Sequence, residues 1–148
     1  NRRFRAIAKL ADDLELPFVA PKKFRPTRRA HQAVLLMDYI DPANTPLLMD
    51  RMFEAIWVKE LDIESPQVLS ELIADSEIPT DLLERVVLSD ELKPAISVSV
   101  NKALKWGITG TPSWVIDNKL MVPGLQEDDF FDRVITKLAA NRAEIREP

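Results

Sequence analysis

Glycine is confined to one short stretch of this chain. The three glycines, Gly107, Gly110 and Gly124, all lie between residues 107 and 126 of a 148-residue sequence. Glycine adopts backbone conformations that other residues avoid, so a chain this poor in glycine places it where the backbone turns tightly or approaches another group closely. We therefore expect residues 107–126 to contain the sharp turns of the molecule and its most informative functional features.

The chain before Gly107 has the apolar spacing of successive helices. A first helix runs from Phe4 to Leu14, Leu16-Pro17 ends it, and Thr27 caps a second helix. Between them, Phe18 to Ala20 favours a short extended segment. The predicted buried stripe of the second helix is Ala30, Val34, Met37 and Ile40.

Hydroxyl residues and prolines mark the starts of the next helices. Thr45-Pro46 and Ser65-Pro66 each supply a capping hydroxyl and a proline for the first helical position. Thr80 is expected to begin a further helix. Ser89 is expected to begin a longer helix that has Pro94 in its second turn and ends at Gly107. The predicted apolar faces are Met49, Met52, Phe53, Ile56 and Trp57; Leu69, Leu72 and Ile73; Leu82, Leu83, Val86 and Val87; and Val100, Ala103 and Leu104.

The pattern changes after Gly107. Ser113 to Ile116 and Lys119 to Val122 are short β-prone runs on either side of the turn signal Asp117-Asn118, which predicts a hairpin. A final helix follows from Glu127, with Asp128 and Asp129 in its first turn, where negative charge is favourable. Its predicted apolar face is Phe130, Phe131, Val134, Ile135 and Leu138.

Composition excludes several classes of function. Twenty basic and twenty-four acidic residues give a net charge of -4, and the basic residues have no interleaved aromatic ladder, so nucleic acid is not an expected partner. No apolar run approaches the roughly 20 residues that cross a bilayer, so no membrane is expected either. Without cysteine these residues hold no disulfide and no thiolate zinc site, and any thiol chemistry needs a sulfur from elsewhere.

Most of the other notable side chains have ordinary structural explanations. His31, the one histidine, has no second ligand at i+4, so we expect no metal site there. Trp57, Met49 and Met52 are expected in the core, and the carboxylate pairs Asp12-Asp13 and Asp128-Asp129 in solvent. The basic cluster of Lys22, Lys23, Arg25, Arg28 and Arg29 is expected to be a solvated loop, with attraction of an anionic substrate as the alternative.

The strand-strand-helix unit preceded by Gly110-Thr111-Pro112 resembles the C-terminal half of a thioredoxin fold. In that fold a cis-proline opens the first of the two strands, so the resemblance implies a cis bond before Pro112, although most X-Pro bonds are trans. A cis bond there turns the preceding backbone outward. The N–H and C=O of Thr111 are then free to pair with an extended peptide or with glutathione.

Three stretches extend this resemblance over nearly the whole chain. They are LELPFVAPKKFRPT (14–27), MFEAIWVKELDIESPQVL (52–69) and GITGTPSWVIDNKLMVPGLQ (107–126). In this order they resemble the DsbA superfamily, within it the clade of 2-hydroxychromene-2-carboxylate isomerases, kappa-class glutathione transferases and FrnE-like oxidoreductases. The resemblance implies an α/β, thioredoxin-like fold with a large all-helical insertion.

The same resemblance predicts three regions. Residues 1–26 are the tail of the N-terminal thioredoxin part and a linker, residues 27–106 are the helical insertion, and residues 107–148 are the C-terminal thioredoxin half. Members of the clade begin with a strand, a nucleophile loop and a helix that have no counterpart here, so the chain reads as a fragment. The catalytic group there is a serine that stabilises the glutathione thiolate or a Cys-x-x-Cys, and both use a helix N-terminus to lower a thiol pKa.

The segment after the second strand departs from the glutathione-binding pattern. Isomerase and kappa members have a Gly-x-Asp-Arg-Leu run whose aspartate binds the γ-glutamyl group, whereas this chain has Gly124-Leu125-Gln126-Glu127, which looks more like the P-G-A-Q of the oxidoreductases. The approach loop has Pro26-Thr27-Arg28 where the clade commonly has an asparagine. The resemblance thus implies Thr111 and Pro112 as catalytic-site residues and Thr111 and Gln126 as contacts of glutathione, the one cofactor considered.

Two classes of function follow from the resemblance. The first is a thiol-dependent enzyme, either a thiol-disulfide oxidoreductase or a glutathione-dependent isomerase or transferase, acting on a small-molecule, thiol or peptide substrate. The second is a non-catalytic thioredoxin-like peptide-binding module or a truncated form. A homodimer is a further expectation, because dimers are common in the clade. We expect a cytoplasmic location, or a periplasmic one if a signal peptide lies upstream.

Overall fold

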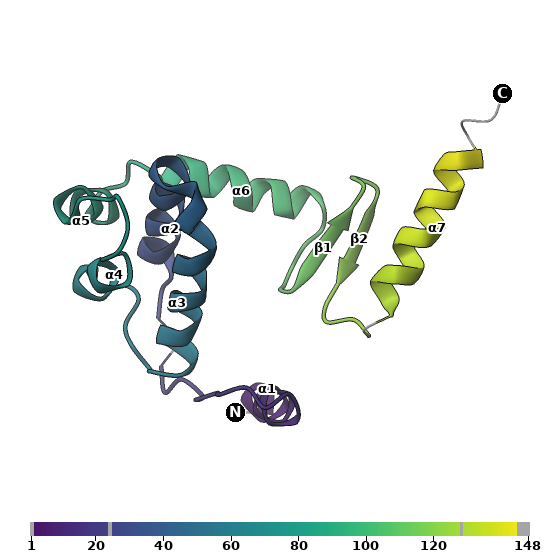
Figure 1. Ribbon diagram of the computed structural model, residues 1–148, viewed down its shortest axis with the longest axis horizontal. Helices are drawn as coiled ribbons and strands as arrows, with labels where there is room; N and C mark the ends of the chain where they lie inside the picture. Colours follow the sequence, from purple (N-terminus) through teal and green to yellow (C-terminus); the bar gives the residue numbers. More distant parts are fainter. Residues whose placement is uncertain (1, 24, 128, 145–148) are drawn as a thin grey trace. The chain divides into compact units, whose positions relative to one another are not determined.

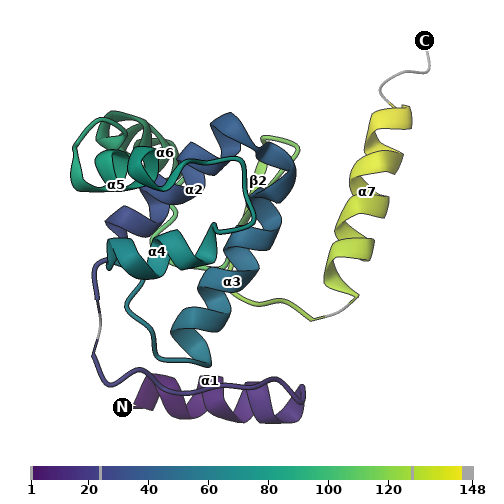
Figure 2. The same ribbon diagram turned by 60° about the vertical axis from the view of Figure 1, so that its left-hand side comes forward.

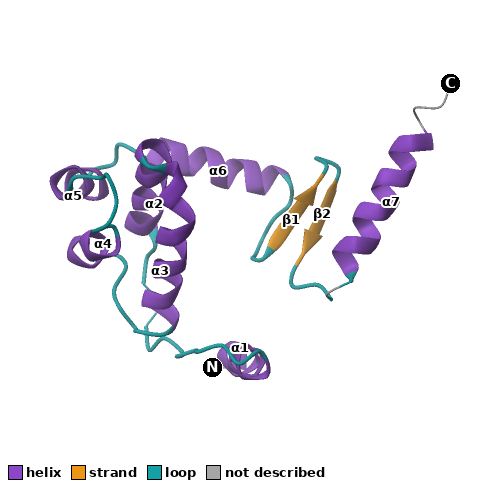
Figure 3. Cartoon of the chain, viewed as in Figure 1, coloured by secondary structure: helices purple, strands orange, loops and turns teal. Residues whose placement is uncertain are grey.

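A computed structural model describes residues 2–23, 25–127 and 129–144 of the chain. Helices form most of it, and a single hairpin lies between the last two of them (Figures 1 and 3). The chain divides into two compact units, one ending at Val98 and the other beginning at Ser99, within the same helix. The three regions predicted from the sequence, with boundaries after residues 26 and 106, stay predictions.

The first unit is a helical cluster. Its elements are α1 (Arg2–Asp13), α2 (Arg28–Ile40), the 3-10 turn η1 (Pro42–Asn44), α3 (Thr45–Trp57), α4 (Pro66–Leu72), α5 (Thr80–Leu88) and the start of α6 (Lys93–Lys105). Helices α2, α3, α4 and α5 surround one core, and α1 lies beside them (Figure 2). The fully buried apolar side chains of this core include Ala33, Leu48, Leu69 and Leu83, one from each of the four helices.

The buried face of α3 differs from the predicted one. Leu48, Met52 and Ala55 are buried, at the i, i+4, i+7 spacing of a helical face. Met49 and Phe53 are exposed, Phe53 by 55%, so their assignment to the core is wrong. The apolar surface of α3 is wider than the area that its neighbours cover, and spacing alone does not tell which part of a wide stripe is covered. On α2, Ile40 is exposed for the same reason.

The residues predicted as helix caps lie at or next to the helix starts, but their side chains do not make the expected capping hydrogen bonds. Ser65 is the residue before α4 and Pro66 is its first residue, as predicted, but the Ser65 hydroxyl donates to the Gln67 side chain at 2.8 Å and makes no capping bond. Thr45 is the first residue of α3 and not its cap, because η1 runs directly into the helix and Asn44 takes the cap position. The side chain of Thr27 likewise makes no capping bond to α2.

Ser89 ends a helix where the sequence predicted that it begins one. Its N–H and its hydroxyl both donate to the carbonyl of Val86, at 3.3 and 3.0 Å, and so close α5. The next helix, α6, begins four residues later at Lys93. Pro94 therefore stands in the first turn of α6, where a missing N–H costs little, and not in the second turn.

Gly107 ends α6 as predicted. Its φ is +71°, its N–H donates to the carbonyl of Leu104 at 2.9 Å, and the N–H of Ile108 donates to the carbonyl of Ala103 at 3.1 Å. These two bonds use carbonyls that the last turn of a helix otherwise leaves unpaired. The glycine thus ends the helix and redirects the chain toward the hairpin.

The second unit contains the predicted hairpin and final helix. Strands β1 (Ser113–Ile116) and β2 (Leu120–Pro123) pair antiparallel, with Trp114 opposite Val122. Asp117 and Asn118 both have positive φ, as tight hairpin turns require, and the N–H of Lys119 donates to the carbonyl of Ile116 at 3.1 Å. Helix α7 (Phe130–Glu144) follows. The predicted first-turn residue Asp128 lies outside the described residues.

Candidate functional site

The bend before the hairpin is the candidate site that the sequence predicted. The peptide bond between Thr111 and Pro112 is cis, and both residues are exposed. The carbonyl of Pro112 accepts a hydrogen bond from the N–H of Gly124 at 2.8 Å, which joins the bend to the end of β2. The hydroxyl of Ser113 donates to the carbonyl of Gly110 at 2.7 Å and joins it to the preceding residues. The bend is thus held on both sides of Thr111.

The main-chain polar groups of Thr111 differ from those of its neighbours. Neither its N–H nor its C=O has a hydrogen-bond partner among the residues that the structure describes, whereas the carbonyls of its neighbours Gly110 and Pro112 both accept a hydrogen bond. Main-chain groups exposed in this way bind water or the main chain of another molecule. An N–H and a C=O on one residue can pair with both polar groups of one residue in an extended chain, as at the edge of a sheet.

Gln126 stabilises the loop after β2. Its amide nitrogen donates to the carbonyls of Pro123, at 2.9 Å, and Gly124, at 3.4 Å. Gly124 has φ +79°, so this turn takes a conformation that favours glycine. The side-chain donor of Gln126 is therefore committed to its own loop. A contact between Gln126 and glutathione stays a prediction, and it would use the side-chain oxygen.

Aromatic rings connect the hairpin to the helix that follows. The rings of Trp114 and Phe131 meet edge to face, with centroids 5.0 Å apart, and Phe130 contacts Phe131 at 5.4 Å. Arg142, in the last turn of α7, forms an ion pair with Asp117 in the hairpin turn. Trp114 nevertheless remains 46% exposed. The strand after the bend therefore presents an aromatic surface that a bound chain could contact.

Trp57, predicted as a core residue, lies at the edge of the helical unit. It is only half-buried, and its ring stacks on Phe18 with centroids 5.7 Å apart and an interplanar angle of 22°. Phe4 packs against both rings at 6.4 Å. The N–H of Val19 donates to the carbonyl of Trp57 at 2.6 Å, so the predicted extended segment runs alongside the end of α3.

Most side chains of the basic cluster are exposed, as expected, although Arg28 and Arg29 belong to α2 and not to a loop. Lys22 pairs with Glu60 at 3.2 Å, Arg25 pairs with Asp62, and Arg28 pairs with Asp90. The guanidinium of Arg29 donates to the main-chain carbonyl of Glu64 at 2.9 Å. The main-chain N–H of Arg29 donates to the side-chain carboxylate of Glu64. Lys23 alone of the five has no ion pair or hydrogen bond to any other described residue.

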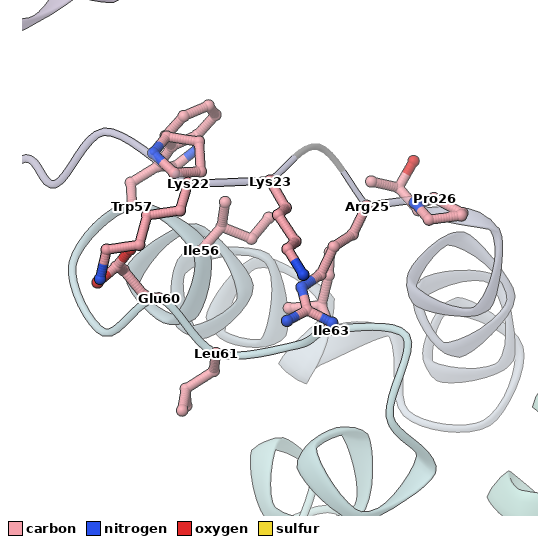
Figure 4. Close-up of a pocket in the computed structure, with 11 residues that line it drawn as sticks. Lys22, Lys23, Arg25, Pro26, Ile56, Trp57, Glu60, Leu61 and Ile63 are labelled. Atoms are coloured by element: carbon pink, nitrogen blue, oxygen red, sulfur yellow. The ribbon is translucent and has the colours of Figure 1, made fainter.

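A pocket that the sequence did not reveal lies beside this cluster. Its volume is about 480 Å³, and it opens between the linker that precedes α2 and the segment that runs from the end of α3 to Ile63 (Figure 4). The side chains that line it include Lys22, Lys23, Arg25, Ile56, Trp57 and Ile63. The two segments lie at least 29 positions apart in the sequence, from Thr27 to Ile56, so no local pattern predicts that they meet. The one available signal was that both belong to stretches that carry the family resemblance.

The remaining candidates form no further site within the described part of the chain. His31 is exposed on α2, and no group of three or more potential metal ligands occurs among these residues. Asp13 pairs with Lys9 at 2.6 Å, and Asp129 pairs with Arg133, so each of these carboxylates lies in an exposed i, i+4 pair. None of the helices described is long and apolar enough to cross a membrane.

The chain resembles one known protein family. Residues 2–136, more than nine-tenths of the chain, match the profile of the DSBA family, described as a DSBA-like thioredoxin domain. The match covers both units, and it includes the cis-proline bend and the hairpin. No curated protein matches the chain.

Proposed function

Because the chain belongs to the family of DSBA-like thioredoxin domains, we propose that it binds the extended backbone of a thiol or disulfide substrate at Thr111. The family is of the thiol-oxidoreductase type, and the mostly helical chain with a small two-stranded sheet is consistent with a thioredoxin-like fold that carries a helical insertion. On this proposal the chain supplies the substrate-binding half of a thiol site.

The observation that carries this proposal is the pairing of the main chain around the bend. The carbonyls of Gly110 and Pro112 accept bonds from within the unit, whereas both polar groups of Thr111 are unpaired among the described residues and the residue is exposed. A substrate that pairs with Thr111 displaces only water. Each such hydrogen bond contributes about 0.5–1.5 kcal/mol, which is up to tenfold in affinity.

The reaction that this binding serves is thiol-disulfide exchange. A thiolate attacks one sulfur of a disulfide, a new S–S bond forms, and the other sulfur leaves as a thiolate. The 148 residues contain no cysteine, so the attacking thiolate belongs to the substrate, to glutathione or to residues beyond this sequence. The role of Thr111 is to hold the substrate backbone in place, and Pro112 shapes the site beside it.

A glutathione-dependent isomerase or transferase is the second candidate. Glutathione also has a peptide backbone that Thr111 can pair with, and the side-chain oxygen of Gln126 has no partner among the described residues. An amide oxygen is a weaker partner for the γ-glutamyl ammonium than a carboxylate, because it has no charge. This difference favours a peptide or protein disulfide over glutathione as the substrate.

Two substitutions at one position test the binding mode. Thr111→Pro removes the N–H that the substrate uses, whereas Thr111→Ala keeps it and removes only the side chain. We expect the proline variant to bind an extended disulfide-bonded peptide about two- to tenfold more weakly, and the alanine variant to bind within about twofold of the parent chain. Amide NMR titration measures both affinities, and hairpin chemical shifts confirm that each variant is folded.

The same titration separates the candidate functions. Binding of the peptide but not of millimolar glutathione supports the oxidoreductase or a non-catalytic peptide-binding module, and turnover after addition of a thiol nucleophile distinguishes these two. Glutathione binding that shifts the side-chain amide of Gln126 supports the isomerase or transferase. Equal loss of binding in the proline and alanine variants, or no shift of the Thr111 amide with either ligand, contradicts the proposal.

A further inference from the structure

We propose that Met49 is a reversible oxidation site, at which a peroxide converts the exposed thioether to a sulfoxide. The chain contains no cysteine, so its four methionine sulfurs are the atoms that such an oxidant attacks first. Met49 lies on α3, in the helical unit. The inference concerns neither the Thr111 bend nor the pocket beside the linker, and it does not depend on the proposed function.

Exposure distinguishes Met49 from the other three methionines. Met37 and Met52 are 2% and 6% exposed and belong to the helical core. Met121 is half-buried on β2, whereas Met49 is 42% exposed. A peroxide has to touch a sulfur in order to oxidise it. Met49 should therefore react first, and the two core residues last.

The reaction needs only the sulfur and the peroxide. A lone pair of the thioether attacks one oxygen of hydrogen peroxide, so an S–O bond forms and the O–O bond breaks. After proton transfer the products are the sulfoxide and water, which means that the sulfur loses two electrons and the peroxide gains them. A thiol-dependent reductase reverses the change: two thiols become a disulfide, and the sulfoxide oxygen leaves as water.

The position of Met49 allows it to carry the added oxygen in the folded chain. A sulfoxide is polar, and at an exposed position solvent hydrates its oxygen. At Met52 the same oxygen would enter a core of apolar side chains, where an unpaired polar group is unfavourable. Oxidation at Met49 therefore changes the surface of the protein, whereas oxidation at Met52 would disturb its packing.

The surface that changes is an apolar stripe of α3. Phe53 is 55% exposed and follows Met49 by one helical turn, so the two side chains lie on the same side of the helix. A sulfoxide at Met49 makes one half of this stripe polar, and reduction restores it. Reversible oxidation thus controls how strongly this part of α3 attracts other apolar surfaces.

The oxidation rates of the individual methionines test the assignment. Peptide mass spectrometry of the whole chain after timed treatment with hydrogen peroxide measures all four rates in one sample. We expect Met49 to react faster than Met121 and at least about fivefold faster than Met37 and Met52. In concentrated urea, which unfolds the chain, the four rates should agree within about twofold, because every thioether is then exposed.

Two substitutions at position 49 test the effect on the surface. Met49→Leu removes the sulfur and Met49→Gln supplies a polar group, and both replacements have nearly the helix propensity of methionine. On a hydrophobic-interaction column the parent should elute earlier after mild peroxide treatment, and a sulfoxide reductase should restore its position. The leucine variant should not shift, and the glutamine variant should elute early without treatment. Met121→Leu is the matched control, and it should shift as the parent does.

Several results would overturn the proposal. They are a rate at Met121 or at a core methionine equal to that of Met49, differences among the four rates that persist in urea, and equal shifts of the treated parent and the treated Met49→Leu variant. The thermal transition of the chain oxidised at Met49 should match that of the untreated parent. A lower transition temperature would contradict the inference that the sulfoxide changes the surface alone.

The exposure of Met49 also makes its variants suitable for this comparison. Substitutions at exposed positions rarely disturb folding, so each variant should keep the thermal transition of the parent.

Discussion

Gln32 is the one buried polar or charged residue among those described in the chain. It is 0% exposed on α2, and its amide nitrogen donates to the carbonyls of Val86, at 3.1 Å, and Ser89, at 2.9 Å. The carbonyl of Val86 also accepts hydrogen bonds from the N–H and the hydroxyl of Ser89. The carbonyl of Ser89, in contrast, accepts its hydrogen bond from Gln32. A single side chain thus holds the end of α5 against α2.

Replacing Gln32 by leucine should destabilise the fold. The substitution keeps the approximate volume of the side chain but leaves the carbonyl of Ser89 without its donor, which costs about 1–3 kcal/mol in the free energy of unfolding. Gln67 is exposed on α4, and Gln67→Leu should change that free energy by less than about 0.5 kcal/mol. Urea denaturation measures both variants. Equal effects would show that burial of the Gln32 amide is not what matters.

At the scale of elements, glycines define the change from helix to hairpin. Gly107 and Gly110 lie three residues apart, and a Cβ added at either position would meet nothing within 4 Å. They differ in backbone conformation, because Gly107 has φ +71° and Gly110 is outside the left-handed region. Any difference between alanine substitutions at the two positions therefore reports on the backbone and not on packing.

Gly107→Ala should cost about 1–2 kcal/mol, because an L-residue in the left-handed conformation brings its Cβ close to the following carbonyl. Gly110→Ala should be neutral or stabilise by less than about 1 kcal/mol, since it reduces the entropy of the unfolded chain. Thermal unfolding monitored by circular dichroism gives the comparison. If Gly110→Ala were as damaging as Gly107→Ala, the left-handed turn would not be the reason why α6 ends there.

Local sequence signals predicted where helices and turns begin and end better than they predicted which side chains are buried. Pro66, Gly107 and the Asp117-Asn118 turn stand where they were expected, because each restricts the backbone on its own. The exposure of Phe53 was not predictable, since it depends on how far neighbouring helices cover α3. The role of Ser89 was wrong for a related reason: a hydroxyl can stabilise either end of a helix, and only the next helix start decides which.

The candidate sites also differ in whether a local sequence signal or only the folded structure reveals them. Thr111 and Pro112 were predicted because a short contiguous motif resembles one in a family. The pocket was not, because its walls come from two segments that meet only in the folded chain, and because Lys23 differs from its basic neighbours only in lacking a partner among the described residues. The sequence shows five cations in the basic cluster, and only the contacts in the described residues distinguish Lys23 from the other four.

At the scale of the whole molecule, the buried residues are unevenly distributed. Among its described residues, the helical unit has fourteen buried apolar residues in one cluster, from Ala30 to Val87. In the second unit, Val122 is the one residue of its described part that is buried to the same degree. Considered by itself, a two-stranded hairpin with so little burial has marginal stability. The two units should therefore resist opening to different extents.

Amide hydrogen exchange should show this difference directly. We expect the amides of α2 and α5 to be the slowest in the chain, and those of β1 and β2 to exchange at least about a hundredfold faster, because local opening of the hairpin exposes little apolar surface. Mass spectrometry or NMR measures both sets of amides in the same sample. Hairpin amides that exchange as slowly as those of α2 would contradict this prediction.

The N–H and C=O of Thr111, which have no partner among the residues described, have a consequence for how this protein can vary. Every amino acid except proline has the same N–H and C=O, so a binding group made of main-chain atoms survives almost any mutation of the residue that bears it. If Thr111 binds the substrate backbone as proposed, the affinity for that backbone should therefore be insensitive to every substitution at position 111 except proline. Changes in preference among substrates have to arise at side chains around the bend, and the half-exposed Trp114 is the first place where such a change can occur.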